Sequence, residues 1–81
     1  MDSTEITRNL LRQTLQLGDR ADSLTDSSGL LGEIPELNSL TVVALISGIE
    51  EQLGCEIGDG EINGEIFATF GSLRAFVESK L

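Results

Sequence analysis

The 81-residue sequence contains no histidine, no tryptophan and no tyrosine, and it has one cysteine and one proline. Histidine is the most usual general base near neutral pH, so its absence argues against a Ser–His or Cys–His catalytic arrangement. The lone Cys55 excludes an intrachain disulfide and a cysteine-based zinc site, so the chain needs no oxidising compartment. These absences favour a non-catalytic protein.

Basic residues are also scarce, because five Lys and Arg stand against 14 Asp and Glu, for a formal net charge of −9. The stretch from Ala21 to Leu73 contains no Lys or Arg at all. Nucleic acids and anionic membranes are bound through cationic side chains, so neither is an expected partner. The expected partner is a protein with a basic patch. The alternative is an acidic surface that only keeps the protein soluble.

Long apolar runs are absent as well, and none approaches the roughly 20 residues of a membrane span. The first five residues carry neither the basic nor the apolar part of a secretory signal, so we expect a soluble, cytoplasmic monomer. With 40% hydrophobic residues, the chain is long enough for one small domain over residues 1–81. A core of Leu, Ile and Val with three phenylalanines is typical of a small helical bundle.

Three segments show the apolar spacing of three and four residues that predicts helices. They cover residues 2–17, 40–53 and 70–81, and the middle one is the clearest. Either Asn38 or Ser39 caps that middle helix. Asp2 caps the first predicted helix and Thr69 caps the last. Gly18 ends the first helix and Gly54 ends the middle one.

Residues 18–37 form a long connection in which Gly32 and Pro35 exclude a continuous helix. A short helix fits residues 61–66. We therefore predict an all-α four-helix bundle with three longer helices and one short helix. Its long loop lies between the first two helices.

The acidic segment after the middle helix places Asp59, Glu61 and Asn63 at the spacing of an EF-hand calcium loop. The twelfth position of such a loop needs a bidentate glutamate, and here it is Phe70. We therefore predict no metal site.

Ser39 stands at the start of the clearest helix, directly after the long connection. An Asn-Ser pair is most often an ordinary helix cap. The position also suits a covalently attached phosphodiester, because backbone N–H groups and the helix dipole favour an anion there. Leu40, Val43 and Ser47 follow on a strip beside the core stripe. This strip either contacts a second neighbouring element or faces a partner protein.

The chain resembles the acyl carrier protein family from Leu31 to Leu81, most strongly from Glu36 to Ile57. Family members carry Asp-Ser-Leu at the start of their second helix, where this chain has residues 38–40, Asn-Ser-Leu. The acidic run at 50–57 looks like the family's end of that helix. The segment Phe-Ala-Thr-Phe-Gly-Ser-Leu at 67–73 looks like the family's entry to the last helix.

The resemblance implies a non-catalytic carrier of the acyl-carrier fold. A phosphopantetheinyl transferase would attach 4′-phosphopantetheine from coenzyme A to Ser39, between Asn38 and Leu40. An acyl group would then travel as a thioester to acyl-transfer, ketosynthase or acyl-ligase type enzymes with basic docking patches, in fatty-acid-like, lipid or polyketide metabolism. The expected recognition strip is Leu40, Val43, Ser47, Glu50, Glu51 and Glu56. The expected acyl pocket is Val43, Ile46, Ile62 and Ile66.

Three departures from the family pattern suggest a specialised carrier. Asn38 replaces the usual Asp, Thr41 and Ala44 stand where fatty-acid carriers commonly have acids, and the segment 58–65 is longer. Docking near Ser39 should therefore be less electrostatic. Two alternatives stay open: a carrier of aminoacyl or peptidyl groups, and an unmodified acidic adaptor in which Ser39 only caps a helix.

Overall fold

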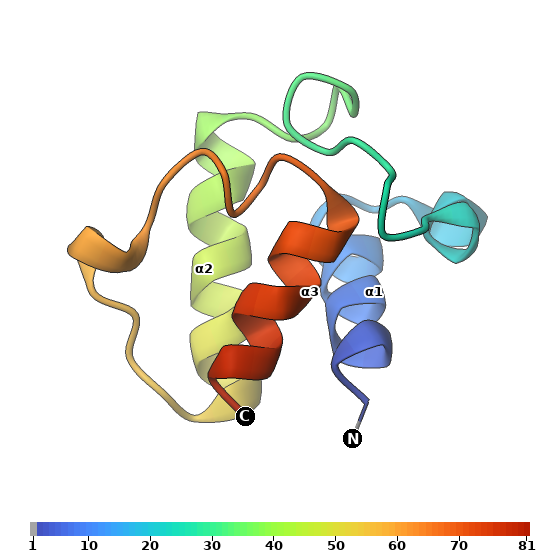
Figure 1. Cartoon of the computed structure of the whole chain (residues 1–81). Helices are drawn as coiled ribbons and strands as arrows, with labels where there is room; N and C mark the ends of the chain where they lie inside the picture. Colours follow the sequence, from blue (N-terminus) through green and yellow to red (C-terminus); the bar gives the residue numbers. More distant parts are fainter. Residues whose placement is uncertain (1) are drawn as a thin grey trace.

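The computed structural model describes residues 2–81, apart from the side chain of Asp59. Three α-helices pack around one core (Figure 1), and within residues 2–81 the chain forms no strand beyond a single antiparallel bridge between Gly29 and Thr69. The all-α prediction is thus confirmed. The elements are α1 (Ser3–Thr14), the 3₁₀-helix η1 (Gly18–Ser23), α2 (Ser39–Leu53), the 3₁₀-helix η2 (Asp59–Glu61) and α3 (Phe70–Ser79).

The first helix ends at Thr14, three residues earlier than predicted. Gln16 and Gly18 adopt left-handed backbone angles, with φ of 54° and 57°, and these turn the chain out of the helix. Leu15 and Leu17 follow the helix and are still buried. The apolar pattern therefore continues past the helix end because the turn keeps both leucines on the core.

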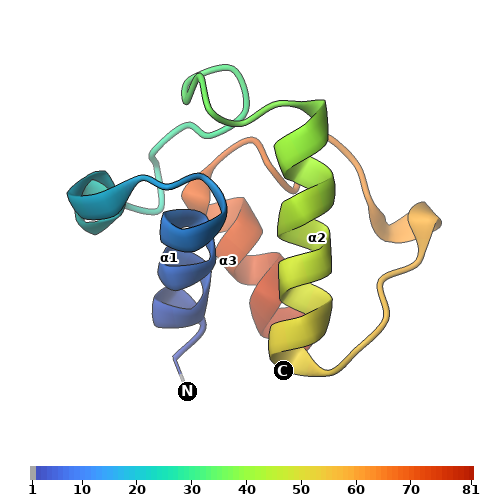
Figure 2. The same cartoon turned by 180° about the vertical axis from the view of Figure 1, so that it is seen from behind.

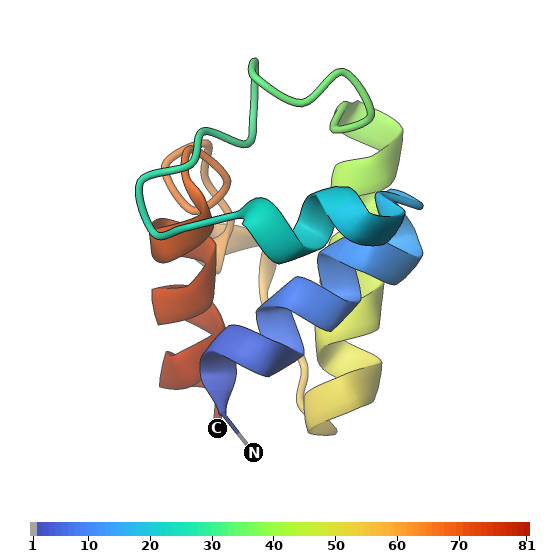
Figure 3. The same cartoon turned by 90° about the vertical axis from the view of Figure 1, so that its right-hand side faces the viewer.

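The 3₁₀-helix η1 lies across α1 (Figure 3), and Arg8 of α1 holds it there. Its Nε donates to the carbonyl of Ala21 at 3.0 Å, and its Nη2 donates to the carbonyl of Leu24 at 2.9 Å. The guanidinium also lies 5.5 Å from the ring centroid of Phe70. One cationic side chain thus connects α1, the start of the long connection and α3.

The predicted middle helix is confirmed as α2, with its buried face centred on Leu45 and Ile49. It ends at Leu53, and the following Gly54, with a left-handed φ of 65°, is the expected stop. The predicted short helix at 61–66 is instead the earlier 3₁₀-helix η2, on the side of α2 away from α1 (Figure 2). Glycines at 58, 60 and 64 disfavour a longer helix here.

The last helix, α3, begins at Phe70 with Thr69 as its cap, as predicted, and ends at Ser79. The connections that precede α2 and α3 are hydrogen-bonded to each other. Leu30 and Leu31 donate their backbone N–H groups to the carbonyls of Ala68 and Phe67, both at 2.9 Å. These bonds hold the two connections together. None of the described helices has the length and apolarity needed to cross a membrane.

Candidate functional site

Ser39 is the first residue of α2, and its side chain is exposed to solvent. Capping is done by its neighbour: the Oδ1 of Asn38 accepts the N–H groups of Leu40 at 2.9 Å and Thr41 at 3.2 Å. The Thr41 hydroxyl in turn accepts the N–H of Asn38 at 2.7 Å, which completes a capping box. The choice of cap left open by the sequence is therefore Asn38, and the Ser39 hydroxyl is not needed for that task.

Of the backbone N–H groups expected to be free at the start of α2, those of Leu40 and Thr41 are bound by Asn38. The N–H of Ser39 itself and the helix dipole remain to favour an anion there. No acidic residue lies in the first turn of α2, so no carboxylate there offsets the positive end of the dipole.

A cavity of about 380 Å³ opens beside Ser39. Its walls come from α2, from the connection before α2 and from the segment that follows η2, and apolar side chains predominate. The lining residues are Leu31, Ser39, Val42, Ile62, Asn63, Gly64 and Phe67. An exposed hydroxyl and an apolar cavity therefore adjoin at one end of the bundle.

No family model and no curated protein matches the chain. Among solved structures, the solution NMR structure of a holo acyl carrier protein from Nitrosomonas europaea is similar with a TM-score of 0.89. The two chains are 48% identical over an alignment that covers 99% of this chain and 96% of that one. This chain belongs to the acyl carrier protein family. The resemblance drawn from the sequence is confirmed by this match.

The predicted acyl-pocket residues of this family member separate in the structure. Ile62 lines the cavity beside Ser39, whereas Ile46 and Ile66 are half-buried against the core and are not among its lining residues. Val43 is 62% exposed, and Val42 takes its place in the wall. Consecutive helix residues point about 100° apart, so only one of the two valines can face inward.

The predicted apolar strip of α2 faces solvent. Leu40 is 83% exposed and Val43 is 62% exposed, and Ser47 is exposed one turn further along. The structure therefore excludes the interpretation in which Leu40 and Val43 pack against a second element of the same chain. That the strip faces a partner protein stays a prediction.

The predicted acidic residues differ in their surroundings. Glu51 and Glu56 are exposed, but Glu50 is half-buried and its Oε2 accepts the backbone N–H of Ile57 at 2.7 Å. Glu50 therefore braces the turn after α2. Upstream of Ser39, the carboxylate of Glu36 binds Arg20 through two hydrogen bonds, of 2.5 and 3.1 Å. This hydrogen bonding lowers the pKa of Glu36 and raises that of Arg20.

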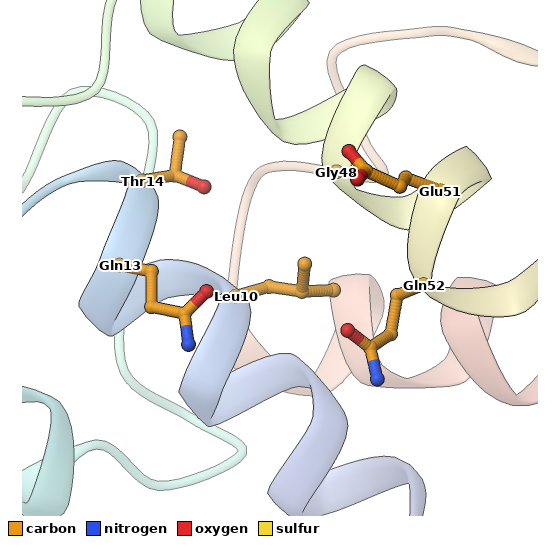
Figure 4. Close-up of a pocket in the computed structure, with 6 residues that line it drawn as sticks. All are labelled: Leu10, Gln13, Thr14, Gly48, Glu51 and Gln52. Carbon is orange, nitrogen blue, oxygen red and sulfur yellow. The ribbon is translucent and has the colours of Figure 1, made fainter.

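A second hollow, of about 410 Å³, lies between α1 and α2 (Figure 4). Leu10 of α1 points into the gap between the helices, toward the stretch of α2 that contains Gly48. A Cβ at Gly48 would lie 3.2 Å from a methyl carbon of Leu10, so the glycine allows a close approach. The remaining lining side chains are polar: Gln13, Thr14, Glu51 and Gln52.

Among the described side chains, no cluster of three or more Cys, Asp and Glu could hold a metal ion. The side chain of Asp59, which the calcium-like spacing involves, lies outside the described residues. Sequence reasoning also missed Leu31 and Phe67, which line the cavity beside Ser39. No local pattern marks either residue as a cavity wall, because each reaches the cavity through the hydrogen bonds that join residues 30 and 31 to residues 67 and 68.

Proposed function

We propose that this chain is an acyl carrier protein that bears a 4′-phosphopantetheine arm on the Oγ of Ser39. The acyl group is bound as a thioester at the end of the arm and is presented to partner enzymes. The observation that carries this proposal is the exposed Ser39 at the start of α2, with the capping done by Asn38 and an apolar cavity beside it. The chain itself is not a catalyst in this scheme.

Loading of the arm requires a phosphopantetheinyl transferase and coenzyme A. The Oγ of Ser39 forms a bond to the phosphorus of the pantetheine phosphate, the nucleotide part of coenzyme A leaves, and the hydroxyl proton passes to a base of the transferase. The dipole of α2 stabilises the attached phosphodiester. Asn38 supports this, because an aspartate at the same place would bring a like charge next to the phosphate.

The cavity beside Ser39 favours an aliphatic cargo over an aminoacyl or peptidyl one. Its apolar walls include Leu31, Val42, Ile62 and Phe67. Burying an alkyl chain against such walls is favourable, whereas an ammonium group would lose its hydration without a charged partner, and a peptide group would give up hydrogen bonds to water. We propose that this cavity receives part of the acyl chain.

The proposed partners are acyl-transfer, ketosynthase or acyl-ligase type enzymes of fatty-acid-like, lipid or polyketide metabolism. Their basic patches would meet two exposed acids, Glu51 near the end of α2 and Glu56 just after it. We expect the carrier to act as a cytoplasmic monomer.

The test is the intact mass of the protein after incubation with coenzyme A and a broad-specificity phosphopantetheinyl transferase. We expect the wild type to gain one phosphopantetheine and Ser39→Ala to gain none. Ser79→Ala, which removes an exposed serine at the end of α3, is the matched control and should be modified like the wild type. A wild type that stays unmodified, or a gain that persists in Ser39→Ala, contradicts the proposal.

A further inference from the structure

Asparagine occurs three times in the chain, and one of the three is followed by glycine, in the pair Asn63-Gly64. The side-chain amide of an asparagine can be attacked by the backbone nitrogen of the next residue, which closes a cyclic succinimide. Glycine in the next position favours this attack, because it has no Cβ to hinder the nitrogen and leaves the backbone free to turn. The other two asparagines precede a leucine and a serine.

The surroundings of Asn63 leave this reaction open. Both residues of the pair are exposed and lie outside the helices, between η2 and α3. The N–H of Gly64 donates no hydrogen bond to a described residue, so this nitrogen is available to lose its proton and attack. A Cβ at Gly64 would meet no atom beyond its chain neighbours within 4 Å, so there is room for the ring.

One hydrogen bond holds the Asn63 side chain, and it is easily given up. The Oδ1 of Asn63 accepts the backbone N–H of Ile66 at 3.2 Å. The same N–H also donates to the backbone carbonyl of Asn63 at 3.3 Å, so it keeps a partner when the side chain swings toward Gly64. Little therefore opposes the movement that brings Cγ to the attacking nitrogen.

The fold protects the other two asparagines. Asn9 lies inside α1, where the N–H of the next residue is bound to a carbonyl one turn back. The Oδ1 of Asn38 accepts the N–H groups of Leu40 and Thr41, so ring closure there would break the cap of α2. Both the sequence and the structure thus single out Asn63.

We propose that Asn63 is a modification site, at which the folded chain converts asparagine spontaneously to aspartate and isoaspartate. The nitrogen of Gly64 bonds to the Cγ of Asn63, the Cγ–Nδ2 bond breaks, and the Nδ2 group leaves as ammonia with the proton of the Gly64 amide. Water then opens the ring. Cleavage between Cγ and the nitrogen gives aspartate, and cleavage at the main-chain carbonyl gives isoaspartate. Water is the only co-reactant.

The conversion changes the wall of the cavity beside Ser39, because Asn63 and Gly64 both line it. A neutral amide becomes a carboxylate next to the apolar side chains of Ile62 and Phe67. An alkyl chain that enters the cavity would then strip water from a charged group, which is unfavourable. This consequence for the cargo rests on the proposed function, whereas the modification itself does not.

The test incubates the full, unloaded chain at physiological temperature and mildly alkaline pH, and follows its intact mass and peptide map. A synthetic peptide with the sequence of residues 61–66 sets the rate for an unprotected Asn-Gly pair. We expect the folded wild type to gain the mass of one amide-to-acid exchange at a rate within about tenfold of the peptide, with both products at residue 63.

Two glycine variants show that the attack comes from Gly64. Gly64→Ala has open space for its Cβ, so it should keep the fold and slow the conversion at least about tenfold. Gly58→Ala is the matched control in the same segment. It follows an isoleucine and its Cβ would make only an ordinary contact, at 3.6 Å from a carboxylate oxygen of Glu61, so it should convert at the wild-type rate.

Three results would overturn the inference: a wild type that converts more than about tenfold slower than the peptide, a change that maps to Asn9 or Asn38, and a Gly64→Ala variant that matches the wild type. Unfolding in urea removes the cap of α2. Conversion at Asn38 should then become faster than in the folded chain, and an equal rate in both states would contradict its protection.

A second measurement separates the modification from the proposed function. Wild type and Asn63→Asp are loaded with phosphopantetheine that bears an alkyl thioester, and the rise in the midpoint of thermal unfolding over the unloaded form is compared. The rise should be smaller by about half or more in Asn63→Asp. Equal rises overturn the consequence for the cargo alone. A wild type that accepts no phosphopantetheine overturns the proposed function, and conversion at Asn63 would stand without it.

Discussion

Replacing Arg8 by methionine should destabilise the fold well beyond what is usual for a partly exposed charged residue. Methionine keeps an unbranched stem that can pack against Phe70, but it cannot donate hydrogen bonds. The change removes the bonds to the carbonyls of Ala21 and Leu24, at 3.0 and 2.9 Å. It also removes the cation 5.5 Å from the Phe70 ring.

The size of the loss follows from these contacts. A hydrogen bond from a charged donor contributes about 1.5–3 kcal/mol, and an exposed cation–π contact adds about 0.5–1 kcal/mol. Because Arg8 is only half-buried, water can hydrogen-bond to the two carbonyls that it leaves. We therefore expect the free energy of unfolding to fall by about 2 kcal/mol. A domain of this length has a total stability of roughly 4–12 kcal/mol. The midpoint of thermal unfolding should therefore fall by about 8–16 °C.

The assay is urea and thermal unfolding, followed by far-ultraviolet circular dichroism. Arg12→Met is the control, because Arg12 lies one turn further along α1 and binds the exposed Asn9 and Asp22. Exposed contacts of that kind should cost less than about 1 kcal/mol. The reasoning is refuted if Arg8→Met loses less than about 0.5 kcal/mol, or no more than the control.

Two further predictions concern other contacts. Gly71→Ala should destabilise the fold by about 1–3 kcal/mol in urea unfolding, because a Cβ there would lie 2.8 Å from the backbone oxygen of Asp26. Gly48→Ala should cost less, because its Cβ would meet only the ends of two side chains, those of Leu10 and Thr14. Equal losses for the two variants would contradict this account. The hydrogen bond from Arg20 lowers the pKa of Glu36, so this pair stabilises the fold above the ordinary carboxylate pKa and stops doing so as pH falls through the lowered value. The stability difference between wild type and Glu36→Gln should thus be fully present at pH 7 and should shrink as the pH falls below the ordinary carboxylate pKa. A difference that stays constant through acid pH would argue against the pair.

The helices could be predicted from the sequence because their signals are local. The apolar spacing of α2, its asparagine cap and the glycine at position 54 all act within a few residues of one another. The end of α1 was placed too late because Leu15 and Leu17 continue the apolar pattern after the helix stops. The apolar pattern therefore predicts the burial of Leu15 and Leu17 correctly. It does not predict the left-handed turn at Gln16 and Gly18 that brings them to the core.

Ser39 could be predicted because its position relative to a strong helix is itself a local signal. The walls of the neighbouring cavity could not, because they depend on contacts between distant segments. Leu31 reaches the cavity through the bonds that join its connection to residues 67 and 68. The role of Glu50 likewise depends on how the chain folds back after α2, so the sequence alone placed it with the free acids.

The two ends of the described chain lie near each other, at the pole of the bundle opposite the start of α2 (Figure 1). The hydroxyl of Ser3 and the carboxylate of Glu78 are 3.5 Å apart, which fixes this closeness. An affinity tag, a fluorophore or a solid support joined at either end would therefore stand clear of Ser39. The same geometry permits the domain to be inserted into a surface loop of a host protein, with the start of α2 and Ser39 pointing away from the host.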